Sequence, residues 1–183
     1  MTRAAEEPEP EAESSSRPDR PLPPPRRARV VADVNVLVQA FLSSKDPAAR
    51  VLDLAWQAEI LLVVSRDLTA ELRETLAKPR LQSRFGYAPE AASLHVEETV
   101  LLGEIVADVP RVFDYPRDPD DAYLVDLAVA ADARLITSVD NDLLDLMADT
   151  PDGIAFRDRF PGLEVLTPPS LLARLSRTSK AAR

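Results

Sequence analysis

Acidic side chains recur in this sequence at the ends of short apolar runs, where several of them could share one site. Asp33 follows the run 30–32, and Asp121 precedes an almost uncharged stretch that ends at Thr137. A second acidic cluster, led by Asp140, follows that stretch. If these runs are strands and helices of one α/β unit, the acids lie at one edge of a parallel sheet, where such folds bind their ligands.

Glu71 joins this set from a predicted helix. On a wheel at roughly 100° per residue, Glu71 flanks the inward stripe, whereas Glu74 points outward. The stripe consists of Leu68, Leu72, Thr75 and Leu76. The candidate cluster is therefore Asp33, Glu71, Asp121 and Asp140, with Asp142 beside the last.

Four carboxylates brought close together repel one another, so such a cluster is typical of a site that holds a cation. The chain has no cysteine and one histidine, His95, so a thiolate or imidazole site is excluded. Hard oxygen ligands suit Mg²⁺ or Mn²⁺. Carboxylate-bound Mg²⁺ recruits phosphate oxygens, which points to phosphoryl chemistry.

Helix capping is the simpler explanation for any single aspartate in this set. Asp and Asn are preferred caps, and a negative charge near a helix N-terminus is worth about 0.3–1 kcal/mol. At the first predicted helix Asn35 is the better cap candidate, which leaves Asp33 without an obvious structural role. That makes Asp33 the strongest functional candidate of the four.

The elements that must position these acids alternate between strand-like and helix-like patterns, which favours an α/β fold. The predicted strands are 30–32, 60–64, 105–109, 135–137 and 163–166. The predicted helices begin near Val36, at Asp46, after the cap Ser65, at 80 with a break at 85–87, at Ala122 and at Pro168, while Gly153 lies in a predicted loop. Trp56 is expected in the core, and His95 on the surface or between helices.

With 183 residues, the chain is long enough for one domain with a core of its own. We predict a disordered tail over 1–27, a folded domain over 28–175 and a disordered basic tail over 176–183. The formal charge of −9 argues against a strongly basic nucleic-acid binder, although it is compatible with a metal-filled acidic site. No membrane span or signal peptide is visible, so we expect a soluble, cytoplasmic protein without a membrane partner.

Four segments together resemble PIN-domain proteins. They are ADVNVL at 32–37, VVSRDLTAEL at 63–72, DPDDAYLVDLAVAADARLITSVDNDLL at 118–144 and LEVLTP at 163–168. The resemblance runs from about Arg29 to Leu175 and is greatest to the bacterial toxin components of toxin–antitoxin pairs. It implies a three-layer α/β/α sandwich with a central, mostly parallel sheet.

The resemblance also implies a function: an Mg²⁺- or Mn²⁺-dependent endoribonuclease, the toxin of a toxin–antitoxin pair. Asp33, Glu71, Asp121 and Asp140 would be its metal-binding quartet and Asp142 an auxiliary ligand. Asn35, Thr137 and Ser138 would support these ligands. The implied partners are an RNA substrate, a small antitoxin protein and a second copy of the chain in a dimer. The neighbours Asp118 and Asp120 crowd Asp121, which is chosen because it directly precedes Ala122.

Three other functions remain to be compared with this one. An aspartyl phosphatase usually has a second Asp two residues after the first, where this chain has Asn35. A response-regulator receiver needs a lysine after a late strand, and none lies between Ala128 and Thr150. A PIN domain kept as a non-catalytic RNA- or protein-binding module normally lacks some carboxylates, and here none of the four is missing.

Overall fold

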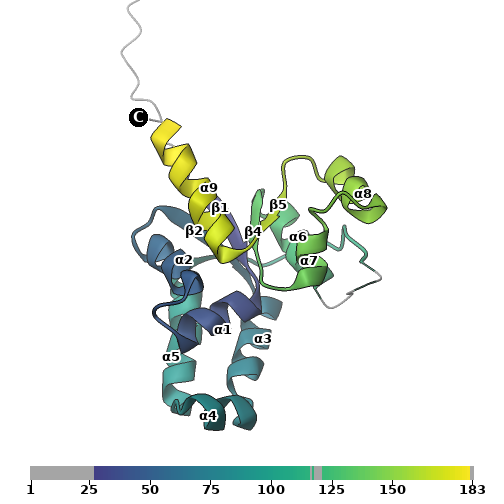
Figure 1. Ribbon diagram of the computed structural model, residues 1–183. Coiled ribbons are helices and arrows are strands. Elements are labelled where there is room, and N and C mark those ends of the chain that lie inside the picture. The colour runs from purple at the N-terminus through teal and green to yellow at the C-terminus, as the bar shows by residue number, and fades with distance from the viewer. Residues whose placement is uncertain (1–26, 116, 118–120, 182–183) are drawn as a thin grey trace, which may run out of the picture.

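The computed structural model describes residues 27–115, 117 and 121–181 (Figure 1). The tail predicted for 1–27 lies outside these residues, apart from Arg27. The strands are β1 (Ala28–Ala32), β2 (Ile60–Ser65), β3 (Gly103–Val106), β4 (Leu135–Thr137) and β5 (Glu164–Leu166). The helices are α1 (Val34–Leu42), α2 (Pro47–Trp56), α3 (Arg66–Leu76), α4 (Pro79–Phe85), α5 (Pro89–Leu102), α6 (Ala122–Ala130), α7 (Asn141–Asp145), α8 (Pro151–Arg159) and α9 (Pro168–Ala181).

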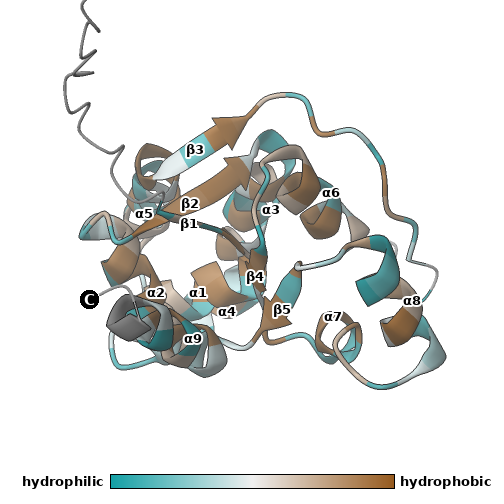
Figure 2. Cartoon of the chain, turned by 90° about the horizontal axis from the view of Figure 1, so that it is seen from above, coloured by the Kyte–Doolittle hydropathy of each residue, from teal (hydrophilic) through white to brown (hydrophobic). Residues whose placement is uncertain are grey.

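The five strands form one sheet in the order β3-β2-β1-β4-β5, with every neighbouring pair parallel. The central strand β1 pairs with β2 on one side and with β4 on the other. Seen from above, α2, α5 and α9 lie on one side of the sheet and α6 on the other (Figure 2). The predicted α/β/α sandwich is therefore confirmed, with a sheet that is entirely parallel.

Local sequence signals account for several helix starts. The Ser65 hydroxyl accepts a hydrogen bond from the backbone N–H of Leu68 at 3.1 Å and so caps α3. Asp46 caps α2 in the same way, with Pro47 at the first helical position. These caps fix the point at which the chain leaves a strand or loop, and hence which residues of the helix face the sheet.

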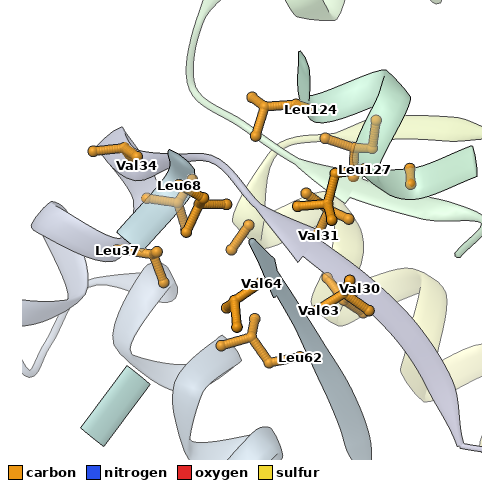
Figure 3. Close-up of a cluster of buried hydrophobic side chains, with 14 of the residues drawn as sticks. Val30, Val31, Val34, Leu37, Leu62, Val63, Val64, Leu68, Leu124 and Leu127 are labelled. Atoms are coloured by element: carbon orange, nitrogen blue, oxygen red, sulfur yellow. The ribbon is translucent and has the colours of Figure 1, made fainter. Parts of the chain in front are cut away.

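The core is continuous between the sheet and the helices on both sides (Figure 3). Valines from β1 and β2 meet side chains of α1, α3 and α6, and each such side chain contributes about 1.5–3 kcal/mol when fully buried. Helix α6 comes from the almost uncharged stretch that follows Asp121, and its residues Leu124, Val125, Leu127 and Ala128 are inaccessible to solvent. This packing holds the start of α6, where Asp121 lies, against the sheet.

The segment between β3 and α6 contains no helix or strand among its described residues, 107–115 and 117. Side chains hold it in place instead. The carboxylate of Asp126, a buried residue of α6, accepts hydrogen bonds from the backbone N–H groups of Val112 (2.8 Å) and Phe113 (2.7 Å). The Tyr115 hydroxyl donates to the carbonyl of Asp142 at 2.8 Å. We call residues 111–115 the strap, because they tie α6 to α7.

Several sequence-based expectations about the fold were wrong. Trp56 is 54% exposed rather than in the core, because it is the last residue of α2 and faces outward. Gly153 lies inside α8 rather than in a loop. The third strand begins at Gly103 and ends at Val106, earlier than the predicted 105–109.

Of the two places expected for His95, the one between helices is confirmed: the residue is buried, its Nε2 lies 3.0 Å from the carbonyl oxygen of Leu37, and its ring packs on Phe41. It therefore packs α5 on α1, and burial lowers its pKa. The C-terminal helix α9 continues to Ala181, so it includes most of the segment 176–183 that was predicted to be disordered.

Candidate functional site

The four candidate acids come from elements that meet at the carboxyl end of the sheet. Asp33 directly follows β1, and Asp140 lies three residues after β4. Glu71 is on α3, which follows β2, and Asp121 directly precedes α6. The alternatives Asp118 and Asp120 lie outside the described residues.

Asp33 is the buried member of this set, with 2% of its surface exposed. Its Oδ1 accepts a hydrogen bond from the backbone N–H of Asn35 at 3.0 Å, and its Oδ2 accepts one from the Ser138 hydroxyl. Its own backbone N–H donates to the carbonyl of Thr137 at 2.9 Å. Asp33 therefore joins the end of β1 to the end of β4.

Burial is the largest influence on the ionisation of Asp33, and it raises the pKa of this carboxyl above the ordinary value of 3.8. The hydrogen bonds from Ser138 and Asn35 oppose the shift. The negative charges of Glu71 and Asp140 raise the pKa further. These two acids are thus close enough to Asp33 for their charges to be felt.

One expectation about Asp33 was wrong. It is the N-cap of α1, through the bond from the Asn35 N–H, whereas Asn35 is itself a residue of the helix. Asp33 therefore has a structural role at the start of α1. The carboxylate has two oxygens, however, and only Oδ1 makes the capping bond. The exposed Asn35 contributes its backbone N–H to this arrangement.

Ser138 connects Asp33 with Asp140. Its fully buried hydroxyl donates to Asp33 and accepts from the backbone N–H of Asp140 at 2.9 Å. Asp140 in turn caps α7, since its Oδ1 accepts from the N–H of Asp142 at 2.7 Å. The neighbouring Thr137 is also buried, and its side-chain oxygen forms no hydrogen bond with any described residue.

Tyr123 is a site residue that the sequence reasoning missed. Its hydroxyl donates to Oε2 of Glu71 at 2.7 Å, linking α6 to α3. Burial raises the pKa of Tyr123, as does this hydrogen bond, and the charges of Glu71, Asp33 and Asp121 add to the effect. The phenol therefore lies close enough to Glu71, Asp33 and Asp121 for their negative charges to disfavour its ionisation. Its place two residues after Asp121, in the first turn of α6, was the available signal.

Asp142 has a different set of contacts. Its carboxylate forms an ion pair with Arg117, which also pairs with Asp145 at 3.1 Å. Asp142 was expected to be an auxiliary metal ligand, and Arg117 carries a positive charge in the segment before α6. In this structure each neutralises the other, and both are partly exposed, so the pairing contributes little stability.

The donor atoms of this site suit Mg²⁺ or Mn²⁺ in type, because they are carboxylate and hydroxyl oxygens next to a buried carboxyl with a raised pKa. Within the described ranges, however, no three Asp, Glu, His or Cys side chains are arranged so that they could hold one metal ion. Glu71 is bound to Tyr123 and Asp142 to Arg117. The acids thus share an electrostatic environment, and side-chain movement would be needed to form a coordination shell.

Comparison with known proteins identifies the family. A family model described as PIN domain matches residues 29–142, which is more than half of the chain. The chain belongs to the PIN domain family. The matched range begins in β1 and ends in α7, so it contains all four candidate acids.

A solved structure supports the fold of this PIN domain. The crystal structure of PAE2754 from Pyrobaculum aerophilum is similar with a TM-score of 0.52 and 18% sequence identity, over 82% of this chain and 90% of that chain. At this identity the likeness concerns the fold alone. No curated protein matches the chain. PIN domains are generally nucleases and typically use divalent metal ions.

None of the helices in the described part of this PIN domain is long and apolar enough to cross a membrane.

The raised pKa of Asp33 predicts a pH-dependent stability difference between metal-free wild type and Asp33→Asn. The folded protein binds this proton more tightly than the unfolded chain, so wild type loses stability as pH rises from about 3.8 to the folded-state pKa. Asp33→Asn has no ionisable group at this position, so its stability does not fall for this reason. Urea unfolding in chelator, from about pH 4 to pH 8, should therefore show wild type falling relative to the variant. Parallel stability curves would contradict the assigned pKa direction.

Proposed function

We propose that this PIN domain is a metal-dependent endoribonuclease that hydrolyses RNA phosphodiester bonds. The observation that carries the proposal is the buried carboxylate of Asp33, which feels the charges of Glu71 and Asp140 at the carboxyl end of the sheet. Such a site is unfavourable unless a cation offsets the charge. Membership of a family whose members are generally nucleases supports the same conclusion.

Asp33, Glu71, Asp121 and Asp140 would hold Mg²⁺ or Mn²⁺. When bound, the metal would lower the pKa of a water molecule and stabilise charge on the phosphate that is attacked. The Ser138 hydroxyl bonds both the carboxylate of Asp33 and the backbone N–H of Asp140, so it fixes the positions of these two residues relative to each other. The Tyr123 hydroxyl fixes the position of the Glu71 carboxylate by its hydrogen bond. Asp142 would be an auxiliary ligand through its Oδ2, because its Oδ1 pairs with Arg117.

Exposed basic residues on α3, in the α3–α4 connection and on α4 support a path for the RNA backbone. They are Arg66, Arg73, Lys78, Arg80 and Arg84. They lie on the elements that carry or follow Glu71, so phosphates held there would be led toward the acids. Lys and Arg contacts to phosphate give affinity that is independent of sequence and sensitive to salt.

The direct test of the proposal is RNA cleavage by purified protein with Mn²⁺, with and without excess chelator. Cleavage that needs Mn²⁺ and stops with chelator is the expected result. The alternative function is a non-catalytic RNA- or protein-binding module. RNA binding without cleavage under either condition would support that alternative and contradict the proposal.

Tyr123→Phe is expected to reduce Mn²⁺-dependent cleavage by about tenfold, the lower end of the effect seen when groups that support metal ligands are removed. The phenyl ring keeps the packing, and only the bond to Glu71 is lost. The Mn²⁺-induced rise in melting temperature should shrink as well. Tyr87→Phe is the matched control, because the Tyr87 hydroxyl donates to the backbone carbonyl of Leu76 at the end of α3 and not to an acid. Equal behaviour of both variants would show that Tyr123 does not position Glu71.

A toxin role in the cytoplasm is part of the proposal, and it rests on the resemblance to toxin components of toxin–antitoxin pairs. Growth arrest on expression, relieved by co-expression of a small protein encoded next to this one, is the test. Arrest by wild type but not by Asp33→Asn would tie the effect to the acidic site. Arrest by both would contradict it.

We also propose a homodimer. Helix α5 exposes Leu94 (55%) and Leu101 (78%), which lie seven residues apart on one helix face, and Ile105 of the edge strand β3 is 55% exposed. Exposed apolar side chains gathered on one helix face are typical of interfaces. Light scattering at micromolar concentration should give twice the monomer mass for wild type and the monomer mass for Leu101→Glu. Ile154→Glu, on exposed α8, is the control that should leave the dimer intact.

A further inference from the structure

A second concave surface lies at the end of the sheet opposite to the acids. It is a groove of about 840 Å³ at the amino ends of β1, β4 and β5, bordered by α9. In Figure 1 the C-terminal part of α9 projects past this end of the sheet. Strand β1 has five residues and so separates the groove from Asp33 by about 16 Å. The groove is therefore not part of the candidate nuclease site.

Aliphatic side chains form much of the groove wall. Leu61, Leu135 and Leu175 come from β2, β4 and α9, and Ala28 lies between them at the start of β1. No aromatic side chain is among the described residues that line the groove. A surface of this kind accepts aliphatic side chains, whereas single-stranded nucleic acid is usually bound by stacking of its bases on aromatic rings.

Four arginines line the groove, and two of them already have acidic partners. Arg29 donates to both carboxylate oxygens of Glu104 at 2.8 Å, and Arg174 pairs with Glu164 at 3.2 Å. The positive charges of these two arginines are therefore offset by carboxylates of the chain itself.

The other two arginines, Arg27 and Arg134, are exposed and form no side-chain hydrogen bond or ion pair with any residue in the described ranges. The acids in the lining are Glu164, which is paired, and Asp132. The groove thus carries excess positive charge in a chain whose formal net charge is −9. Such local charge attracts an anionic partner that the rest of the surface would repel.

We propose that this groove binds an acidic, aliphatic-rich peptide segment of a partner protein. Carboxylates of the segment would pair with Arg27 and Arg134, whose planar guanidinium groups match carboxylate geometry. Aliphatic side chains of the segment would contact Leu61, Leu135 and Leu175. Because the groove and the acids lie at opposite ends of the sheet, the partner can be held while RNA occupies the acidic site. The proposal does not depend on nuclease activity.

The test uses a fluorescein-labelled synthetic decapeptide of alternating Glu and Leu, titrated with the full-length protein at low salt and followed by anisotropy. We expect binding that weakens with added salt. Arg27→Glu and Arg134→Glu should each weaken it by about tenfold or more, as expected for loss of a charge-assisted hydrogen bond. Lys45→Glu, an exposed charge reversal between α1 and α2 and outside both the groove and the proposed RNA path, should leave it unchanged. Melting temperatures of the three variants should match wild type.

Four results would overturn the proposal. The first is equal affinity of wild type and both groove variants. The second is equal binding of a Gln–Leu peptide, which would mean that charge plays no part. The third is displacement of the peptide by oligouridine with the same dependence on Arg134, which would identify a nucleic-acid site. The fourth is binding that appears only after deletion of residues 1–26, which would make the chain's own acidic segment the occupant.

Discussion

Replacement of Asp33 by asparagine is expected to lower Mn²⁺-dependent RNA cleavage by at least about a hundredfold, because bound metal supplies several kcal/mol of transition-state stabilisation. The fold should survive. Asparagine keeps the oxygen that accepts the Asn35 N–H and so still caps α1. The substitution removes the buried charge and the Oδ2 that accepts the Ser138 hydrogen bond. The measurements are cleavage of a labelled RNA under single-turnover conditions, together with circular dichroism and the melting temperature.

The matched control is Asp46→Asn. Asp46 caps α2 through the N–H of Ala48 at 2.9 Å, so it has the same capping role as Asp33 but lies outside the acidic cluster. Its variant should cleave RNA as wild type does. If folded Asp33→Asn retained wild-type cleavage, the assignment of the active site would be wrong. If both variants lost activity together, the effect would come from helix capping and not from the site.

Asp140→Asn is expected to have the second largest effect, on the stabilisation of the protein by Mn²⁺. Without metal, the variant has one negative charge fewer beside Asp33 and should be more stable than wild type by about 1 kcal/mol, the usual scale of a stability–function trade-off. Asparagine can still accept the Asp142 N–H that caps α7. Added Mn²⁺ should stabilise wild type by mass action and the variant much less.

Melting curves of both proteins, in chelator and in Mn²⁺, separate metal binding from capping. A role in capping alone predicts equal metal-induced shifts, and that outcome would remove Asp140 from the proposed quartet. Asp142→Asn should be measured as well, because it removes an acid that is paired with Arg117. If Asp142 is not needed for metal binding, Mn²⁺ should raise the melting temperature of this variant as much as that of wild type.

The sequence predicted those parts of the fold that depend on neighbouring residues. Strand β4 has the predicted bounds, Leu135–Thr137, and Ser65 caps α3 as predicted, since both follow from local patterns. Helix α8 was missed because Gly153 was interpreted as a loop residue. A side chain at Gly153 would begin 2.2 Å from the carbonyl oxygen of Ala148, so this glycine allows close packing of the backbone rather than a turn.

The candidate site was predictable only in part, because some of its contacts join residues that are far apart in the sequence. The acids could be chosen because they end or begin apolar runs. The bonds from Tyr123 to Glu71 and from Ser138 to Asp33 join residues 52 and 105 positions apart. Such pairings depend on how helices and strands pack, and no local pattern in the sequence encodes them. The capping role of Asp33 was missed because Asn35 has an equally good capping side chain.

The strand order also decides when during synthesis the acidic cluster can form. Strand β1 lies between β2, which follows closely in the chain, and β4, which begins only at Leu135. Ribosomes add about 5–20 residues per second, so β4 emerges several seconds after β1, β2 and β3. A nascent chain that already contains Asp33 and Glu71 still lacks Asp121 and Asp140. The cluster is therefore completed late in translation, and a nascent chain that ends before Asp140 cannot assemble the proposed nuclease site.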